Sequence, residues 1–294
     1  MRKLTTGDAA FQSLNYILLS LLGIMTLYPF LNLLALSFND SLDSLKGGVH
    51  ILPRAFTLEN YATMFQNTQL YGAALRSLAR TLIGTGLGIF CTALFAYALS
   101  RKEFVFRRGF NLILVVTLYV NGGIIPIYLT IKNLHLTNSF FVYLLPLLIN
   151  GFYIMIMRSS FEQLPAGLTE SAKIDGASDF QTLFRIIIPI SLPVIATITL
   201  FIAVMHWNSW FDNYLYNSRD QKLALLQYEL MKILLNSVGQ QSSQTHVDEN
   251  TVKIISPESI RATMTIIVTV PILLIYPFLQ RYFIKGITIG AIKE

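Results

Sequence analysis

The stretch Leu14–Phe38 reads LNYILLSLLGIMTLYPFLNLLALSF and contains no charged residue. An apolar run of about 18 or more residues is long enough to cross the hydrocarbon core of a bilayer as an α-helix. A second uncharged run extends from Gly109 to Ile131. Only 13% of the chain is charged, against about 25% in an ordinary soluble domain, and the mean hydropathy is +0.55. The sequence therefore predicts an all-α integral membrane protein, because the alternating strands of a membrane barrel are missing.

Six spans are predicted from these apolar runs. Their predicted limits are 13–38, 70–99, 109–132, 140–163, 185–215 and 259–284. Lys and Arg favour cytoplasmic loops, and the densest basic cluster, Arg101–Arg108, lies between the second and third spans. This cluster predicts a multi-pass protein of the bacterial cytoplasmic membrane with both termini in the cytoplasm. We divide the chain into an N-terminal tail, first span and outer loop (1–69), a membrane core (70–285) and a C-terminal tail (286–294).

Charge and cysteine content indicate no nucleic-acid, metal or catalytic site. The net charge of +6 fits the basic loops of a membrane protein, and no compact basic patch with interleaved aromatics suggests nucleic acid. Cys91 is the one cysteine, so it forms no internal disulfide and is predicted to pack within a span. His206 is the only histidine placed in a span, which makes a membrane-embedded enzyme a poor interpretation.

The segment between the fourth and fifth spans is unusual. Residues 164–189 read LPAGLTESAKIDGASDFQTLFRIIIP. Pro165 suits the first turn of a helix over 166–175, and Gly176 can end that helix with a positive φ. Ser178 and Gln181 have the spacing of a capping box for the next helix. Spacing alone leaves two interpretations equal, a helix that docks on a soluble partner and a helix that merely connects two spans.

The helix that follows is predicted from its apolar spacing and its prolines. Four apolar residues are expected on one helical face, namely Phe180, Leu183, Phe184 and Ile187. Pro189 and Pro193 are expected to kink the helix where it enters the membrane.

This segment resembles the EAA loop of ABC importer permeases. The loop's pattern is Glu-Ala-Ala, three residues, Gly, nine residues, Ile, one residue, Leu-Pro. The residues that fall on it here are Glu170, Ala172, Gly176, Ile186 and Pro189, while Ser171 replaces an Ala and Ile188 the Leu. The form KIDGA at 173–177 and the chain end at 280–293 are similar to the carbohydrate branch, which includes the smaller permease of the maltose system. The phrase NGGIIP at 121–126 resembles the group that handles oligosaccharides or polysaccharide fragments.

The resemblance implies the six-helix transmembrane domain of a type I ABC importer with a cytoplasmic coupling helix. The implied coupling residues are Glu170, Ser171, Ala172, Lys173, Asp175, Gly176 and Ala177. The implied partners are a second homologous permease, an ATPase homodimer or heterodimer, an extracytoplasmic sugar-binding protein and membrane lipid. ATP and Mg²⁺ are expected on the ATPase and no cofactor on this chain, which carries no Gly-x-x-x-x-Gly-Lys-Ser/Thr phosphate loop. The expected function is import of a sugar by alternating access, and this likeness favours an oligosaccharide.

Two other transport functions stay open. A permease with the same loop could carry a non-sugar solute such as a polyamine. A secondary transporter would need charged or broken-helix ion sites near the midplane.

A substrate path is predicted from two clusters of polar and aromatic side chains. Arg80 in the second span either lines the outer mouth, where it could favour an acidic sugar, or snorkels to the headgroups. The run HWNSWFDNY at 206–214 mixes rings with hydrogen-bonding groups, so it could border a sugar path or form an aromatic belt. The residues proposed for the path are Arg80, Trp207, Asn208, Trp210 and Phe211. In the outer loop 216–258, residues 234–249 are expected to contact the receptor, or else to form a passive loop.

Overall fold

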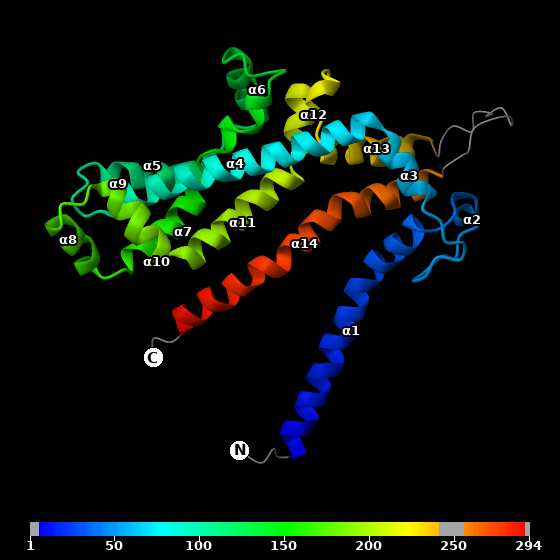
Figure 1. The fold of residues 1–294 in the computed structure, drawn as a ribbon, viewed down its shortest axis with the longest axis horizontal. Coiled ribbons are helices and arrows are strands. Elements are labelled where there is room, and N and C mark those ends of the chain that lie inside the picture. Colours follow the sequence, from blue (N-terminus) through cyan, green and yellow to red (C-terminus); the bar gives the residue numbers. More distant parts are fainter. Residues whose placement is uncertain (1–5, 241–255, 292–294) are drawn as a thin grey trace. The chain divides into compact units, whose positions relative to one another are not determined.

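The computed structural model describes residues 6–240 and 256–291, and its regular elements in those ranges are helices (Figure 1). Three helices are long and apolar enough to cross a membrane, at Phe11–Ser37, Thr68–Ser100 and Pro257–Pro277. Three bent helix pairs pass the same test together, so the described chain reaches six spans when each pair counts as one. The prediction of an all-α membrane protein is confirmed.

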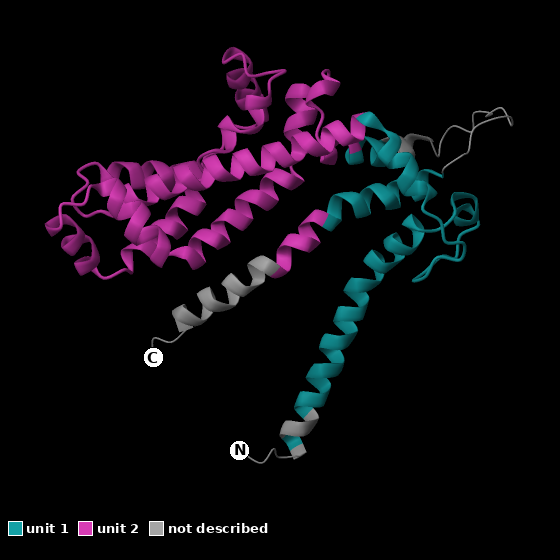
Figure 2. Cartoon of the chain, in the orientation of Figure 1, with its two compact units in different colours: residues 1–68, 230–270 teal, residues 69–229, 271–294 magenta. Residues whose placement is uncertain are grey.

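The contacts divide the chain into two compact units (Figure 2). The first unit comprises the described residues of 1–68 and 230–270, and the second those of 69–229 and 271–294. The helices α13 (Leu226–Gln240) and α14 (Pro257–Ala291) pass from one unit to the other.

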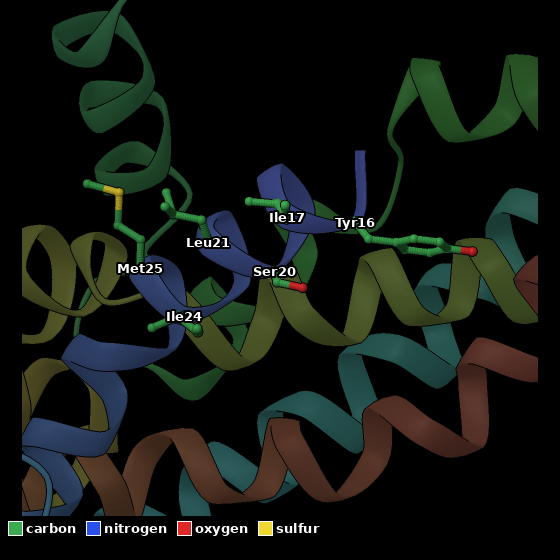
Figure 3. Close-up of a pocket in the computed structure, with 6 residues that line it drawn as sticks. All are labelled: Tyr16, Ile17, Ser20, Leu21, Ile24 and Met25. Atoms are coloured by element: carbon green, nitrogen blue, oxygen red, sulfur yellow. The ribbon is translucent and has the colours of Figure 1, made fainter. Parts of the chain in front are cut away.

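The first helix, α1 (Thr6–Ser37), is apolar and unburied along most of its length. Every side chain from Phe11 to Phe30 is exposed. One face of α1 carries a shallow apolar hollow lined by Tyr16, Ile17, Ser20, Leu21, Ile24 and Met25 (Figure 3). Because one helix supplies all six side chains, the hollow is a groove in a helix surface that suits lipid or another apolar helix.

The segment that follows α1 folds around the buried side chain of Asn39. Its Oδ1 accepts hydrogen bonds from the backbone N–H groups of Arg54 at 2.8 Å and Ala55 at 2.9 Å. Its Nδ2 donates to Asp43 Oδ2 at 3.1 Å, a bond that lowers the pKa of that carboxyl. These bonds join the short helix α2 (Ser41–Leu45) to the chain that leads into α3 (Glu59–Gln66).

The second unit is built on α4 (Thr68–Ser100). One buried apolar cluster joins α4, α7 (Gly151–Glu162) and α11 (Leu192–Asn208). A second cluster joins α6 (Ile124–Asn133), the 3₁₀ turn η1 (Phe140–Tyr143) and the start of α13. Within this unit, α8 (Ala166–Ile174) lies at one end of the bundle, and α6 and α12 (Phe211–Asn217) lie away from that end (Figure 1).

Three of the predicted continuous spans are broken, which corrects the limits given above. In the third span, α5 (Arg107–Tyr119) and α6 meet at a bend of 119°. Gly123 in that break has φ +84°, a conformation that glycine adopts without a Cβ clash, and its N–H is held by Asn121 Oδ1 at 2.9 Å. The Asn-Gly-Gly sequence therefore ends the helix.

The fourth and fifth spans are broken as well. The fourth begins with η1 and the 3₁₀ turn η2 (Leu145–Leu147) and bends by 47° into α7. The fifth bends by 89° between 179–190 and α11. The predicted proline kink is thus found at the pair Pro189 and Pro193, which flank the bend.

The helix before that bend contains one π turn. It consists of α9 (Asp179–Thr182), the π turn η3 (Leu183–Ile187) and α10 (Ile188–Ile190). The prediction of a single apolar face was wrong, because Leu183 and Ile187 are buried while Phe180 and Phe184 are exposed and stack on each other at 6.3 Å. A π turn has more residues per turn than an α-helix, so the expected 3.6-residue spacing does not hold here.

Candidate coupling helix and substrate path

The helix α8 has well-defined ends. Pro165 is its N-cap residue, one position before the first turn in which it was expected. At the other end, Gly176 has φ +77°. Ala177 N–H donates to the carbonyl of Ala172 at 2.9 Å and Gly176 N–H to that of Lys173 at 3.0 Å. This pair of bonds is a Schellman motif, which requires a left-handed residue where the glycine stands.

A capping box starts the next helix immediately afterwards. Ser178 Oγ accepts from Gln181 N–H, and Gln181 Oε1 accepts from Ser178 N–H at 2.9 Å. The predicted capping box is confirmed. Since both ends of the turn at 175–178 are fixed by hydrogen bonds, α8 and α9 keep a defined geometry.

The predicted coupling residues lie mostly on the outer surface of α8. Glu170, Ser171, Lys173, Asp175 and Gly176 are exposed. Ala172 is buried and Ala177 is half-buried, so these two attach the helix to the bundle. Ile174, which sequence reasoning did not single out, is 86% exposed at the end of the helix. An isolated apolar side chain so placed suits a contact with another protein.

Ion pairs join α8 and the neighbouring helices on one side of the bundle. Lys173 Nζ lies 2.5 Å from Glu103 Oε2, which belongs to the connection between α4 and α5. The hydrogen bond from Lys173 lowers the pKa of Glu103, so this carboxylate is ionised at neutral pH. Glu162 at the end of α7 accepts from Arg107 and from Arg158, the latter at 3.0 Å.

A cavity of about 460 Å³ lies beside α8. Its lining includes Arg101, Lys102, Arg107, Glu103, Glu162, Glu170 and Lys173. The charges of both signs largely offset one another, which suits bracing of the helix more than capture of one charged ligand.

In the N-terminal half of α4, Arg80 is fully buried. It pairs with Asp212 of α12, so it does not snorkel to the headgroups. Arg76 donates to the carbonyl of Ala224 at 2.8 Å. The charge of Arg80 is thus matched by a carboxylate, whereas Arg76 is held by a backbone carbonyl.

The aromatic residues of the predicted path separate into two places. Trp207 is buried and lines an apolar cavity of about 540 Å³ with Tyr153, Phe201 and residues of α14. Phe211 instead lines a cavity of about 430 Å³ with Asp212, Tyr216 and Asn121. Trp210 packs edge-on against Phe211 with ring centroids 5.6 Å apart, and Asn208 is exposed and accepts from Gln227 at 3.0 Å. The structure thus brings Trp210 and Phe211 together and sets Trp207 apart.

Several residues of these sites were not found from the sequence. Asp212, Tyr143 and Glu103 meet their partners only through the fold, and no periodic pattern connects them. The expected receptor-contacting segment 234–249 begins in α13, and its part from 241 onward lies outside the described residues. Within the described residues, no group of three or more His, Cys, Asp or Glu side chains could hold a metal ion.

Comparison with known proteins identifies the chain. Residues 84–289 match the family described as "binding-protein-dependent transport system inner membrane component". The chain belongs to this family. It is therefore a permease subunit, and the family expected from the sequence is confirmed.

The permease has relatives that match it along nearly their whole length. It is 34% identical to the polygalacturonan/rhamnogalacturonan transport system permease protein YtcP of Bacillus subtilis, over 96% of this chain and 98% of the relative. It is 35% identical to protein LplC of the same organism, over 98% and 97%.

A solved structure supports the same fold. The permease superposes on a bacterial ABC transporter involved in the import of the acidic polysaccharide alginate with a TM-score of 0.82 and 27% identity, covering 96% of this chain and all of that one. The predicted type I importer architecture is thereby confirmed.

Proposed function

We propose that this permease imports oligosaccharides released from an acidic polysaccharide. The observation that carries the proposal is its full-length likeness to a permease named for polygalacturonan and rhamnogalacturonan and to a chain of an alginate importer. Relatives named for arabinooligosaccharides and lactose are only 25–26% identical. These names favour a sugar over the polyamine alternative.

The permease is proposed to act in a complex. A second, homologous permease completes the membrane pathway, and a separate ATPase dimer that holds ATP and Mg²⁺ docks on the cytoplasmic side. An extracytoplasmic binding protein delivers the sugar; one solved relative, with a TM-score of 0.59 and 17% identity, was captured with an alginate pentasaccharide-bound periplasmic protein. Residues 234–249 are proposed to meet this receptor. With both termini in the cytoplasm, as the basic loops favour, α8 faces the ATPase.

We assign α8 as the coupling helix on the basis of its exposed face and its fixed ends. Glu170, Ile174 and Asp175 point away from the bundle as exposed side chains. The contact with Glu103 and the caps at 176–181 hold the helix, so a movement of the ATPase is passed on to α9 and through the 89° bend to α11.

The uptake of defined solutes tests the proposed substrate. The permease is co-expressed with its partner permease, ATPase and receptor and reconstituted in liposomes loaded with ATP. We expect oligogalacturonate or oligoalginate to enter at least about tenfold faster than neutral arabino-oligosaccharides, a preference of ~1.4 kcal/mol. Putrescine should not enter. Faster uptake of the neutral sugar or of putrescine would overturn the assignment.

Reversal of the Lys173–Glu103 pair tests the bracing of α8. Lys173→Glu places two negative charges together, so we expect sugar moved per ATP hydrolysed to fall. Both side chains of the pair are largely exposed, so solvent screens their attraction and the complex should still assemble. The double variant Glu103→Lys with Lys173→Glu restores opposite charges and should restore coupling. A double variant as impaired as the single one would show that the pair does not brace the helix.

A further inference from the structure

The guanidinium of Arg80 holds both sides of the break between α11 and α12. The helix α11 ends at Asn208 with Ser209 as its C-cap, and α12 begins at Phe211. Arg80 Nη1 donates to the carbonyl of Ser209 at 3.1 Å and to Asp212 Oδ1 at 3.1 Å. Arg80 Nη2 donates to Asp212 Oδ2. Two hydrogen bonds from one guanidinium to one carboxylate fix the orientation of the Asp212 side chain as well as its distance from Arg80.

The guanidinium of Arg80 is closed off from any solute. Arg80 has no exposed surface, and the ring of Tyr143 lies 4.9 Å from its guanidinium carbon. Tyr143 is itself held in place, because its hydroxyl donates to the carbonyl of Leu223 at 2.8 Å. A carboxylate of a sugar therefore cannot reach Arg80, whose charge is already matched by Asp212.

The side chains positioned by this pair line the 430 Å³ cavity on α12. Phe211 and Tyr216 supply aromatic rings, and Tyr216 is itself stacked on Tyr128 with centroids 6.0 Å apart and planes 8° apart. Asp212 also lines the cavity, and its side chain is 18% exposed. A cavity of this size accommodates small molecules. Rings beside one carboxylate oxygen fit the apolar faces and hydroxyl groups of a sugar.

Asp212 keeps one acceptor position for such a hydroxyl. A carboxylate has about four lone-pair sites. Two bonds come from Arg80, and a third comes from Asn213 N–H at 2.9 Å. The remaining site accepts a hydrogen bond without presenting net negative charge, since the pair with Arg80 is neutral.

We infer that Arg80 is a positioning residue for the sugar path, which acts through Asp212 to fix the α11–α12 break and does not read the charge of the sugar. This inference rests on the proposed function for the identity of the solute. The break itself can be tested without any solute, so the two proposals can fail separately.

Uptake kinetics of a double-mutant cycle test the positioning role. Arg80→Gln is expected to lower the maximal uptake rate about tenfold (~1.4 kcal/mol), by the same factor for acidic and neutral oligosaccharides that the wild type transports. Asp212→Asn should have a similar effect, and the double variant should lose no more than either single one, because coupled residues are non-additive. Arg219→Gln, an exposed arginine beyond α12, is the matched control and should transport normally.

Arg80→Lys distinguishes the positioning role of Arg80 from an effect of its positive charge. It also provides a test if the Arg80→Gln complex fails to assemble. Lysine keeps the charge but cannot bond Ser209 and Asp212 as a fork, so uptake should still fall equally for both sugars. A loss confined to the acidic sugar in Arg80→Gln, with normal uptake in Arg80→Lys, would overturn the inference. Additive losses in the cycle would overturn it as well.

A solute-independent readout is possible because the chain has one native cysteine, which can be replaced so that an introduced cysteine is labelled alone. In a Cys91→Ser background, Phe211→Cys reports the orientation of α12 through its rate of thiol labelling in the assembled complex. We expect that rate to change several-fold on adding Arg80→Gln and to stay unchanged on adding Arg219→Gln. An unchanged rate with Arg80→Gln contradicts the positioning role, whichever solute the permease carries.

Discussion

Gly84→Ala should prevent the permease from packing correctly, because α4 and α11 leave no room for a methyl group there. A Cβ built at Gly84 would lie 2.5 Å from His206 Nε2 and 2.6 Å from its Cε1, closer than real Cβ atoms approach any neighbour. His206 is 2% exposed and its ring is rigid. Overpacking of a core costs about 1–3 kcal/mol and occasionally more. Small residues at such crossings let membrane helices approach closely.

Neighbouring glycines of α4 provide matched controls. A Cβ at Gly86 meets nothing within 4 Å, so Gly86→Ala should gain up to about 1 kcal/mol of helix propensity. A Cβ at Gly88 would lie 3.3 Å from Ile202 Cγ2, which predicts an intermediate effect. The melting temperature of the detergent-purified complex should be highest for Gly86→Ala and should fall in the order wild type, Gly88→Ala, Gly84→Ala. Equal melting of the Gly84 and Gly86 variants would show that α11 does not approach at Gly84.

Gly176→Val should abolish sugar uptake while the two permeases still pair. The residue stands at φ +77° in the Schellman motif, where a β-branched side chain is an outlier. The left-handed conformation costs an ordinary residue roughly 1–2 kcal/mol. A large bundle tolerates that loss of stability, so it should still fold. The turn at Gly176, which orients α8, is the part that should be distorted. The measurement is ATP hydrolysis and uptake in the same liposomes, and we expect loss of ATPase binding or hydrolysis without transport.

Asparagine distinguishes backbone strain from a blocked contact. A Cβ at Gly176 meets nothing within 4 Å in this chain, so any steric effect must come from the partner. Asn tolerates a positive φ better than other residues. If strain is the cause, Gly176→Asn should transport nearly normally; if the ATPase approaches closely, Asn should fail as Val does. Glu170→Lys should in either case weaken ATPase docking by reversing an exposed charge. Wild-type transport by both Gly176→Val and Glu170→Lys, with the ATPase bound, would show that α8 is only a connector.

The elements that sequence reasoning predicted well have strong local signals. The uncharged run at 14–38 predicts α1, and a glycine stop followed by a Ser–Gln capping box predicts the ends of α8 and α9. In each case the residues that determine the structure lie within a few positions of one another. The same holds for the bend between Pro189 and Pro193.

The breaks in the spans were harder to predict, because hydropathy does not distinguish a straight helix from a bent one. The Asn-Gly-Gly at 121–123 was noticed for its family likeness, although two adjacent glycines also favour the end of a helix. The π turn likewise leaves no signal in the apolar spacing around Phe184.

The site around Arg80 depends on long-range contacts that no local pattern contains. Arg80 and Asp212 are 132 positions apart, and the charge of Arg80 alone suggested a free cation at the outer mouth. Only the fold places a carboxylate against it and a tyrosine ring over it. The position of Gly84 against His206 is hidden from the sequence for the same reason.

The bent spans also bear on how the chain is made. At 1.5 Å per residue, the 13 residues of α5 and the 10 of α6 are about 20 Å and 15 Å long, and neither crosses a hydrocarbon core of about 30 Å alone. Backbone groups at the Asn-Gly-Gly break must be satisfied by protein or by water in a cavity, because lipid offers no hydrogen bonds. During synthesis α1 and α4 can each enter the bilayer as independent segments, whereas α5 and α6 reach a stable position only with helices already inserted beside them. We therefore expect ordered biogenesis of this permease, with α1 and α4 inserted before α5 and α6 settle beside them.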